Sequence, residues 1–216
     1  MQRTIRGFLE ATHFGPTVLV VTITFFLSRV QYSVTDSLRI AVAILAGQCV
    51  VGWTNDLIDL PLDRAAGRSK KPLVSGKIKV EQLKPAIFIA LFLALLLSLI
   101  GPLGLKGTLV HVLGLLSATS YNLKLKKTSL SFLPYVFSFG SLPWAIYLSA
   151  GKHPPLWLVL GFIFISSAFH FLNVLKDLDA DIAQGVLGLP QRVGRTGSLG
   201  ISLLLISAGL ASVVLR

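Results

Sequence analysis

The sequence predicts an all-α protein, a polytopic bundle of membrane-spanning helices. Of its 216 residues, 53% are hydrophobic and only 13% are charged, and the mean hydropathy is +0.76. Long apolar runs, such as 87–101 and 156–175, belong to segments that reach the ~20 residues a helix needs to cross a bilayer. We therefore expect about seven transmembrane helices.

The apolar segments place these helices in order along the chain. The first follows Arg3 and Arg6, and no clear small-x-small cleavage site separates it from the next, so it is interpreted as a retained helix rather than a signal peptide. The second and sixth continue past their apolar parts into polar clusters, which puts both clusters on the same side of the membrane. We expect one domain over 1–216, with helices at roughly 14–31, 38–57, 84–102, 106–123, 130–149, 155–176 and 197–215.

Positive charges indicate the orientation in the membrane. The formal net charge is +11, and 15 of the 20 Lys and Arg residues lie on the side that also holds the N-terminus and both polar clusters. Because basic residues in short loops face the cytoplasm, we expect that side to be cytoplasmic, with the cell membrane as the location. The basic residues are split among short loops and form no arm, so no nucleic-acid partner is expected.

Six of the nine acidic residues lie in two clusters that share one spacing. Residues at i, i+4 and i+8 project from one helical face, so each cluster predicts a ladder of oxygen ligands. Stacked carboxylates repel one another, whereas Mg²⁺ or Mn²⁺ would neutralise them and leave coordination positions for water or phosphate. The predicted metal ligands are Asn55, Asp59 and Asp63 in the first cluster and Asn173, Asp177 and Asp181 in the second.

The two clusters share their surroundings as well as their spacing. Gly67 and Gly185 follow at the same offset, and we expect the helices to end there. Pro61 removes a backbone hydrogen bond, which predicts a kink or unwinding near Asp63. Basic stretches follow each glycine and are interpreted as loops that fold over a ligand. The matched order predicts two pseudo-symmetric halves around a central cavity open to the cytoplasmic side.

These residues resemble the UbiA superfamily of intramembrane prenyltransferases. The first cluster is similar to the family's N-x-x-x-D-x-x-x-D motif, and the second to its D-x-x-x-D motif. The stretch Arg68 to Leu73 is similar to the family's R-x-x-[RK]-P-L loop, and Tyr121 to Lys126 to its tyrosine and lysine segment. The resemblance covers most of the chain.

The resemblance implies a transferase of alkyl or aryl groups other than methyl. Family members use Mg²⁺ to hold the diphosphate of a polyprenyl donor and alkylate a lipophilic, often aromatic, acceptor in the bilayer. It implies that Asn55, Asp59, Asp63, Asp177 and Asp181 bind metal and diphosphate, the four aspartates being catalytic; Asn173 joins them on spacing alone. The implied diphosphate-binding residues are Arg64, Arg68, Lys71, Tyr121, Lys124 and Lys126, and the spacing leaves open which of the last two lysines faces inward.

The chain departs from the family in length and leaves alternatives open. Members usually have nine transmembrane helices, two more than we expect here. The chain is therefore interpreted as a fragment, a truncated chain or a naturally short member of the family. An ion or metal transporter predicts acids near the bilayer midplane rather than at one face. A CDP-alcohol phosphotransferase is disfavoured, since its D-G-x2-A-R signature is absent from the sequence.

Neighbouring polar residues receive structural interpretations. Asp56 and Asp179 lie about 100° away from the ladder faces on a regular helix, so solvent exposure or support of the ligands is expected. The four histidines, at 13, 111, 153 and 170, are scattered, so no histidine metal site is expected. His170 lies one turn before Asn173, where it either lines the cavity or packs between helices.

Overall fold

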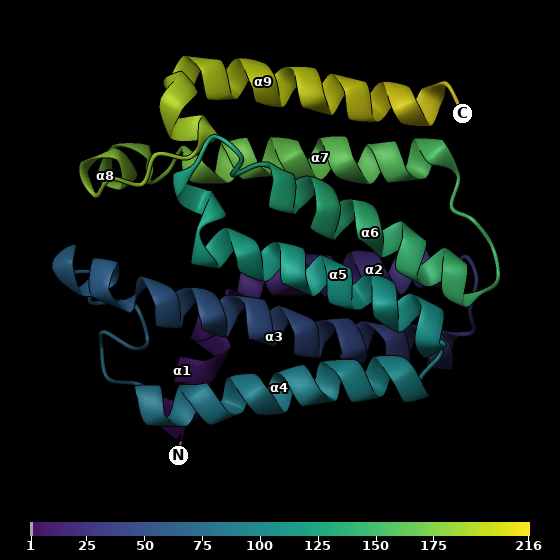
Figure 1. Ribbon diagram of the computed structural model, residues 1–216, viewed down its shortest axis with the longest axis horizontal. Coiled ribbons are helices and arrows are strands. Elements are labelled where there is room, and N and C mark those ends of the chain that lie inside the picture. Colours follow the sequence, from purple (N-terminus) through teal and green to yellow (C-terminus); the bar gives the residue numbers. More distant parts are fainter. Residues whose placement is uncertain (1) are drawn as a thin grey trace. The chain divides into compact units, whose positions relative to one another are not determined.

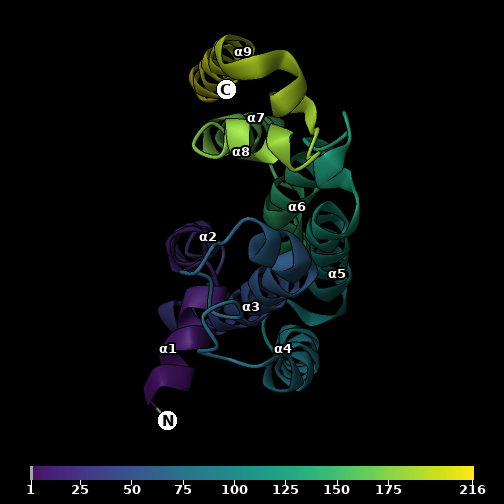
Figure 2. The ribbon, with the colours of Figure 1, turned by 90° about the vertical axis from the view of Figure 1, so that its left-hand side faces the viewer.

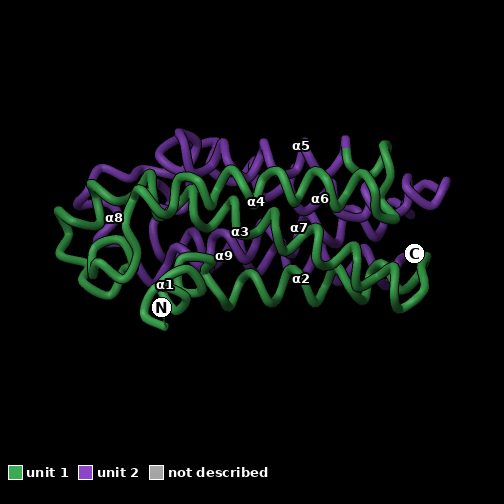
Figure 3. The backbone as a smooth tube through the Cα atoms, turned by 90° about the horizontal axis from the view of Figure 1, so that it is seen from below, with its two compact units in different colours: residues 1–108 green, residues 109–216 purple. Residues whose placement is uncertain are grey.

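The computed structural model describes residues 2–216 and confirms the all-α prediction, because helices are the regular elements throughout these residues (Figure 1). The helices are α1 (Gln2–Ala11), α2 (Phe14–Ser28), α3 (Val34–Ala65), α4 (Val80–Ile100), α5 (Gly104–Leu123), α6 (Leu133–Ser149), α7 (Leu156–Val174), α8 (Leu178–Ala183) and α9 (Leu189–Val214), with a short 3₁₀ helix, η1 (Leu125–Lys127). The chain divides into two compact units, residues 1–108 and 109–216 (Figure 3). Each unit contains one acidic cluster.

Unit 1 is organised around the long helix α3. Helices α1, α2 and α4 all contact it, as the end-on view shows (Figure 2). Near the C-terminal end of α3, a hydrophobic cluster joins Ala11 and Leu60 to Leu73, Ile78 and Leu83. This cluster packs the loop between α3 and α4 against α1 and α3, and so holds a basic loop beside the first acidic cluster.

Unit 2 is built on α7, which contacts both α6 and α9. Small residues allow α7 and α9 to approach each other closely: a Cβ on Gly209 in α9 would lie 2.9 Å from the Ile165 side chain in α7. The Ser202 hydroxyl donates to the Ala168 carbonyl at 3.4 Å, and Ser212 donates to Trp157 at 3.2 Å. Small and hydroxylated residues at helix contacts are typical of membrane bundles.

The seven predicted helices correspond to α2 to α7 and α9, with three corrections. Helices α1 and α8 were not predicted. Helix α3 continues through Asp63 to Ala65, so of the kink or unwinding expected near Asp63, the unwinding is wrong. Helix α9 begins at Leu189 rather than 197, with a break in its backbone at Gly194 (φ 71°, ψ −177°); the predicted helix is the part after this break.

The predicted count of seven membrane spans is not confirmed. Within residues 2–216, four helices are long and apolar enough to cross a membrane, namely α3, α4, α7 and α9. Helices α1 and α2, which meet at a bend of 66°, would together make a fifth. Helix α6 has only 17 residues, and α5 carries Lys106, His111 and a polar last turn.

The turn between α1 and α2 rests directly on α3. A Cβ on Gly52 would lie 2.8 Å from the Ala11 carbonyl oxygen and 2.9 Å from that of Thr12. We therefore predict that Gly52→Ala lowers the thermal unfolding midpoint of the detergent-purified protein, with an overpacking cost of about 1–3 kcal/mol. Gly15→Ala in α2 is the matched control, because a Cβ there meets nothing within 4 Å. Equal midpoints for the two variants would contradict the close contact.

Candidate functional site

The first acidic cluster forms the predicted ladder. Asn55, Asp59 and Asp63 all lie in α3, and their i, i+4 and i+8 positions place them on one face. Asn55 and Asp59 are half-buried, whereas Asp63 is only 1% exposed. A carboxylate as buried as Asp63 requires a partner, because an isolated buried charge is strongly destabilising.

The basic loop after α3 supplies that partner. Gly67, with φ 62°, ends the helix as predicted, because glycine adopts left-handed backbone angles without a Cβ penalty. The Arg68 amide then donates to the Asp63 carbonyl at 2.9 Å, and its guanidinium Nη1 lies 3.0 Å from Asp63 Oδ1. Lys71 Nζ lies 4.0 Å from Asp63 Oδ2. The loop thus folds back over the end of the acidic ladder and places two cations beside Asp63.

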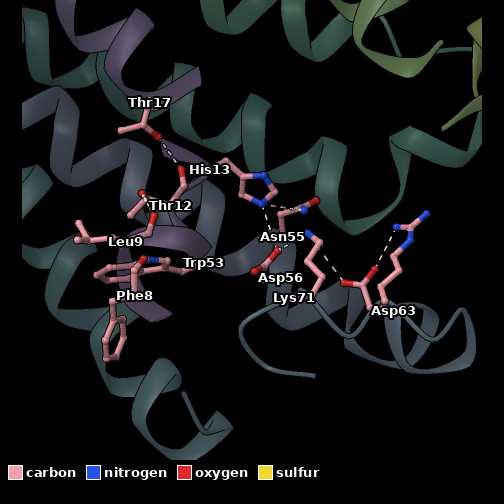
Figure 4. A network of polar contacts seen from close by, with 11 residues as sticks. Phe8, Leu9, Thr12, His13, Thr17, Trp53, Asn55, Asp56, Asp63 and Lys71 are labelled. Atoms are coloured by element: carbon pink, nitrogen blue, oxygen red, sulfur yellow. Dashed lines mark hydrogen bonds and ion pairs between the residues drawn. The ribbon is translucent and has the colours of Figure 1, made fainter. Parts of the chain in front are cut away.

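Asp56 is part of this network, so solvent exposure, one of the two roles expected for it, is wrong, whereas Asp179 is 88% exposed. The Asp56 side chain is 2% exposed, and its Oδ1 accepts from Lys71 Nζ at 2.7 Å. His13 Nε2 lies 3.1 Å from the same oxygen (Figure 4). Asp56 and His13 were not predicted as site residues, because the contact joins positions 43 residues apart in sequence. Arg64, which was predicted to bind diphosphate, is exposed to solvent.

The second acidic cluster does not form the predicted ladder. Asn173 lies in the last turn of α7, which ends at Val174, while Asp177 precedes α8 with φ −114° and Asp181 lies within α8. The triad is therefore split between two helices and a turn. Asn, Asp and Val have low helix propensities, partly because Asn and Asp side chains compete for backbone hydrogen bonds. Gly185, with φ 71°, follows the end of α8 as predicted.

Two hydrogen bonds from neutral groups help to hold the loop after the second acidic cluster. Gln191 Nε2 donates to Asp181 Oδ2 at 2.9 Å, and the Leu189 amide donates to Ser131 Oγ at 2.9 Å. Ser131 Oγ also lies 3.1 Å from Nε2 of the buried His170. Ser131 and Gln191 carry no sequence signal for these roles, since their partners are distant along the chain.

The tyrosine and lysine segment lies beside this loop. A Cβ on Gly188 would come within 2.7 Å of the Lys126 carbonyl oxygen, so the loop and η1 are in close contact. Lys126 is half-buried and Lys124 is exposed. The Tyr121 ring packs against His170 in a T-shaped arrangement, with the ring centroids 5.7 Å apart. His170 thus packs among aromatic rings, which is one of the two roles expected for it.

The residues present fit a hard divalent cation that also uses ligands from a substrate. Within residues 2–216, no group of three or more His, Cys, Asp or Glu side chains is arranged to hold a metal ion. Each cluster offers carboxylate and amide oxygens, the ligands suited to Mg²⁺, which is usually bound by one or two carboxylates together with substrate phosphates. A cage made entirely of protein ligands is not required for such an ion.

Comparison with known proteins gave one family. The model of the UbiA prenyltransferase family matches residues 15–216. No curated protein sequence matches the chain significantly.

Solved structures are similar in fold. A UbiA homologue from Archaeoglobus fulgidus bound to GPP and Mg²⁺ has a TM-score of 0.78 and 16% sequence identity, covering 95% of this chain and 76% of that chain. An apo UbiA homologue from Aeropyrum pernix K1 gives 0.74 and 20%, covering 98% and 77%. A digeranylgeranylglyceryl phosphate synthase gives 0.73 and 21%, covering 98% and 76%. Because the family model spans nearly the whole chain, this integral membrane protein belongs to the UbiA prenyltransferase family.

Proposed function

We propose that the protein transfers a prenyl group from a prenyl diphosphate to a lipophilic or aromatic acceptor in the membrane, with Mg²⁺ bound by its acidic motifs. The observation that carries this proposal is the arrangement in unit 1. Arg68 Nη1 lies 3.0 Å and Lys71 Nζ lies 4.0 Å from the Asp63 carboxylate, which is one of those that would hold the metal. One place thus contains both carboxylates that can bind a metal cation and basic side chains that can bind phosphate oxygens. A diphosphate with a bound metal ion requires both kinds of group.

The chemistry of this site centres on the leaving group. In unit 1, Asp59 and Asp63 would hold Mg²⁺, and in unit 2 Asp177 and Asp181 would do so; the ion would supply positive charge to a diphosphate. Arg68 and Lys71 would donate to the phosphate oxygens. As the C–O bond breaks, its electron pair leaves with the diphosphate, and the resulting allylic cation alkylates the acceptor, which then loses a proton. Stabilising the charge that develops on the leaving oxygen is the main catalytic task.

Relatives support the donor class and widen the choice of acceptors. The Archaeoglobus fulgidus homologue was solved with GPP and Mg²⁺ and also with DMAPP and Mg²⁺, so both diphosphates are donors to test here. Because another relative is named digeranylgeranylglyceryl phosphate synthase, the acceptor panel should contain geranylgeranylglyceryl phosphate beside aromatic compounds. Membranes containing the protein should release diphosphate and form a prenylated product only with Mg²⁺. Metal uptake into vesicles without diphosphate release would instead favour a transporter.

Each acidic motif should be required separately. Asp59→Asn and Asp177→Asn keep the side-chain shape but remove a negative ligand, so we expect diphosphate release at saturating Mg²⁺ to fall at least ~100-fold, as for loss of one transition-state stabilising group. The matched controls are Asp36→Asn, in the first turn of α3, and Asp179→Asn, whose side chain is 88% exposed. If Asp177→Asn releases diphosphate as fast as the parent protein, the proposed role of the second motif is wrong.

Lys71 should have separable roles in folding and in donor binding. Lys71→Ala removes a cation from the buried Asp56, so we expect lower thermal stability together with weaker donor binding. Adding Asp56→Asn removes the buried charge and should restore stability, while donor binding stays weaker by the ~1.5–3 kcal/mol of a hydrogen bond to a charged group.

Donor binding is measured with a non-hydrolysable prenyl diphosphate analogue, and the unfolding midpoint in the same detergent. Lys70→Ala, which changes an exposed neighbouring lysine, is the control. If the double variant binds the analogue as tightly as the Asp56→Asn protein, Lys71 does not contact the diphosphate.

A further inference from the structure

We propose that His13 is a positioning residue that holds Asp56 so that Lys71 can leave it and bind the donor diphosphate. This inference rests on the proposed function of the site. In this role His13, which lies outside both acidic motifs, affects the affinity for a prenyl diphosphate. Four features of unit 1 carry the inference.

The first feature is the backbone of His13 itself. Its φ of 55° and ψ of 62° place it in the left-handed region, and within residues 2–216 it is the only non-glycine residue with a positive φ. This conformation costs an L-residue other than glycine about 1–2 kcal/mol. Strain of this kind persists where the surrounding structure fixes it, and it is often found at functional sites.

The second feature is the set of contacts that fixes the turn on α3 (Figure 4). Trp53 Nε1 donates to the Phe8 carbonyl at 3.2 Å, and Thr17 Oγ1 donates to the Thr12 carbonyl at 2.6 Å. The absence of a side chain on Gly52 lets the turn approach the α3 backbone. These contacts lie on both sides of His13 along the chain, so its ring is held next to Asn55 and Asp56.

The third feature is the proton on the imidazole. His13 Nε2 lies 3.1 Å from Asp56 Oδ1, and an ionised carboxylate only accepts hydrogen bonds. The carboxylate partner therefore assigns the hydrogen to Nε2. Asn55 Nδ2 lies 3.5 Å from the same nitrogen, at the limit of a hydrogen bond, so Asp56 is the principal partner.

The fourth feature is that His13 and Lys71 share one oxygen of a buried carboxylate. Asp56 Oδ1 lies 3.1 Å from His13 Nε2 and 2.7 Å from Lys71 Nζ. If Lys71 moved to a phosphate oxygen and nothing else donated to Asp56, a buried charge would be left alone at high cost. His13 continues to donate when Lys71 leaves, which lowers that cost. Loss of His13 would therefore retain Lys71 on Asp56 and weaken donor binding, although His13 does not touch the donor.

His13→Asn tests this role without adding backbone strain. Asparagine tolerates left-handed angles, but its amide nitrogen is too close to the backbone to reach Asp56 as Nε2 does. We expect the affinity for a non-hydrolysable prenyl diphosphate analogue and for inorganic diphosphate to fall about tenfold, the lower end for a hydrogen bond to a charged group. The KM for the donor should rise by a similar factor, with kcat changed less. His13→Gln, whose amide nitrogen extends about as far as Nε2, should restore most of the affinity.

A second background separates this role from a structural one. In the Asp56→Asn protein, Lys71 is no longer held by the charge at position 56, so His13→Asn should leave diphosphate affinity unchanged there. An equal loss of affinity in both backgrounds would overturn the inference, as would failure of His13→Gln to restore it while the protein remains folded. His153→Asn, which changes an exposed histidine, is the control and should bind as the parent protein does.

The same measurements separate this inference from the proposed function. A parent protein that binds neither diphosphate probe, with or without Mg²⁺, would overturn both. A parent protein that binds them and shows Mg²⁺-dependent release, but no difference between the two backgrounds, would overturn the role of His13 alone.

Discussion

The C-terminal part of α3 carries two buried carboxylates, Asp56 and Asp63, and the fold of unit 1 has to keep both of them paired. Neither side chain is more than 2% exposed, and an uncompensated charge at such a position would be strongly destabilising. The loop between α3 and α4 must therefore return to the helix that it has just left. Gly67 permits the reversal, and Leu73 and Ile78 anchor the loop in the hydrophobic cluster. Apolar burial and ion pairing thus require the same loop conformation, which is the kind of agreement between local and global interactions that specifies one structure.

The same constraint explains why α1 lies where it does. Ala11 belongs to the cluster that anchors the basic loop, and the next two residues form the turn that touches Gly52 and Asp56. A short helix with few contacts of its own is thereby tied to the acidic motif through packing and through a hydrogen bond. Lys71 stabilises the ligand-free fold through Asp56, so in the role proposed for it this lysine exchanges Asp56 for an oxygen of an anionic ligand. His13 stays on the same carboxylate and lowers the cost of that exchange, because a buried carboxylate without a donor is strongly destabilising.

Local patterns in the sequence predicted the first motif better than the second. Both triads have the same spacing, but only in α3 does a continuous helix convert that spacing into one face. Helix α3 persists through Pro61, because tertiary packing of Leu60 and the returning loop outweighs one lost backbone hydrogen bond. Around Asp177 the chain has no such continuous helix: α7 ends at Val174, Asp177 is outside helical geometry, and a short helix, α8, begins again at Leu178. The positions of His13, Ser131 and Gln191 could not be predicted, because each depends on contacts between distant segments.

The two motifs are consequently held in different ways although they share a spacing. Asp63 is only 1% exposed, and Arg68 Nη1 lies 3.0 Å from its Oδ1; breaking such a buried pair is strongly destabilising. In the second motif, Asp177 is exposed to solvent. Arg195 lies 3.8 Å from Asp179, whose side chain is 88% exposed, so this ion pair contributes little to stability. Sequence symmetry between the two halves describes the order of the acidic residues along the chain, and it does not extend to their burial.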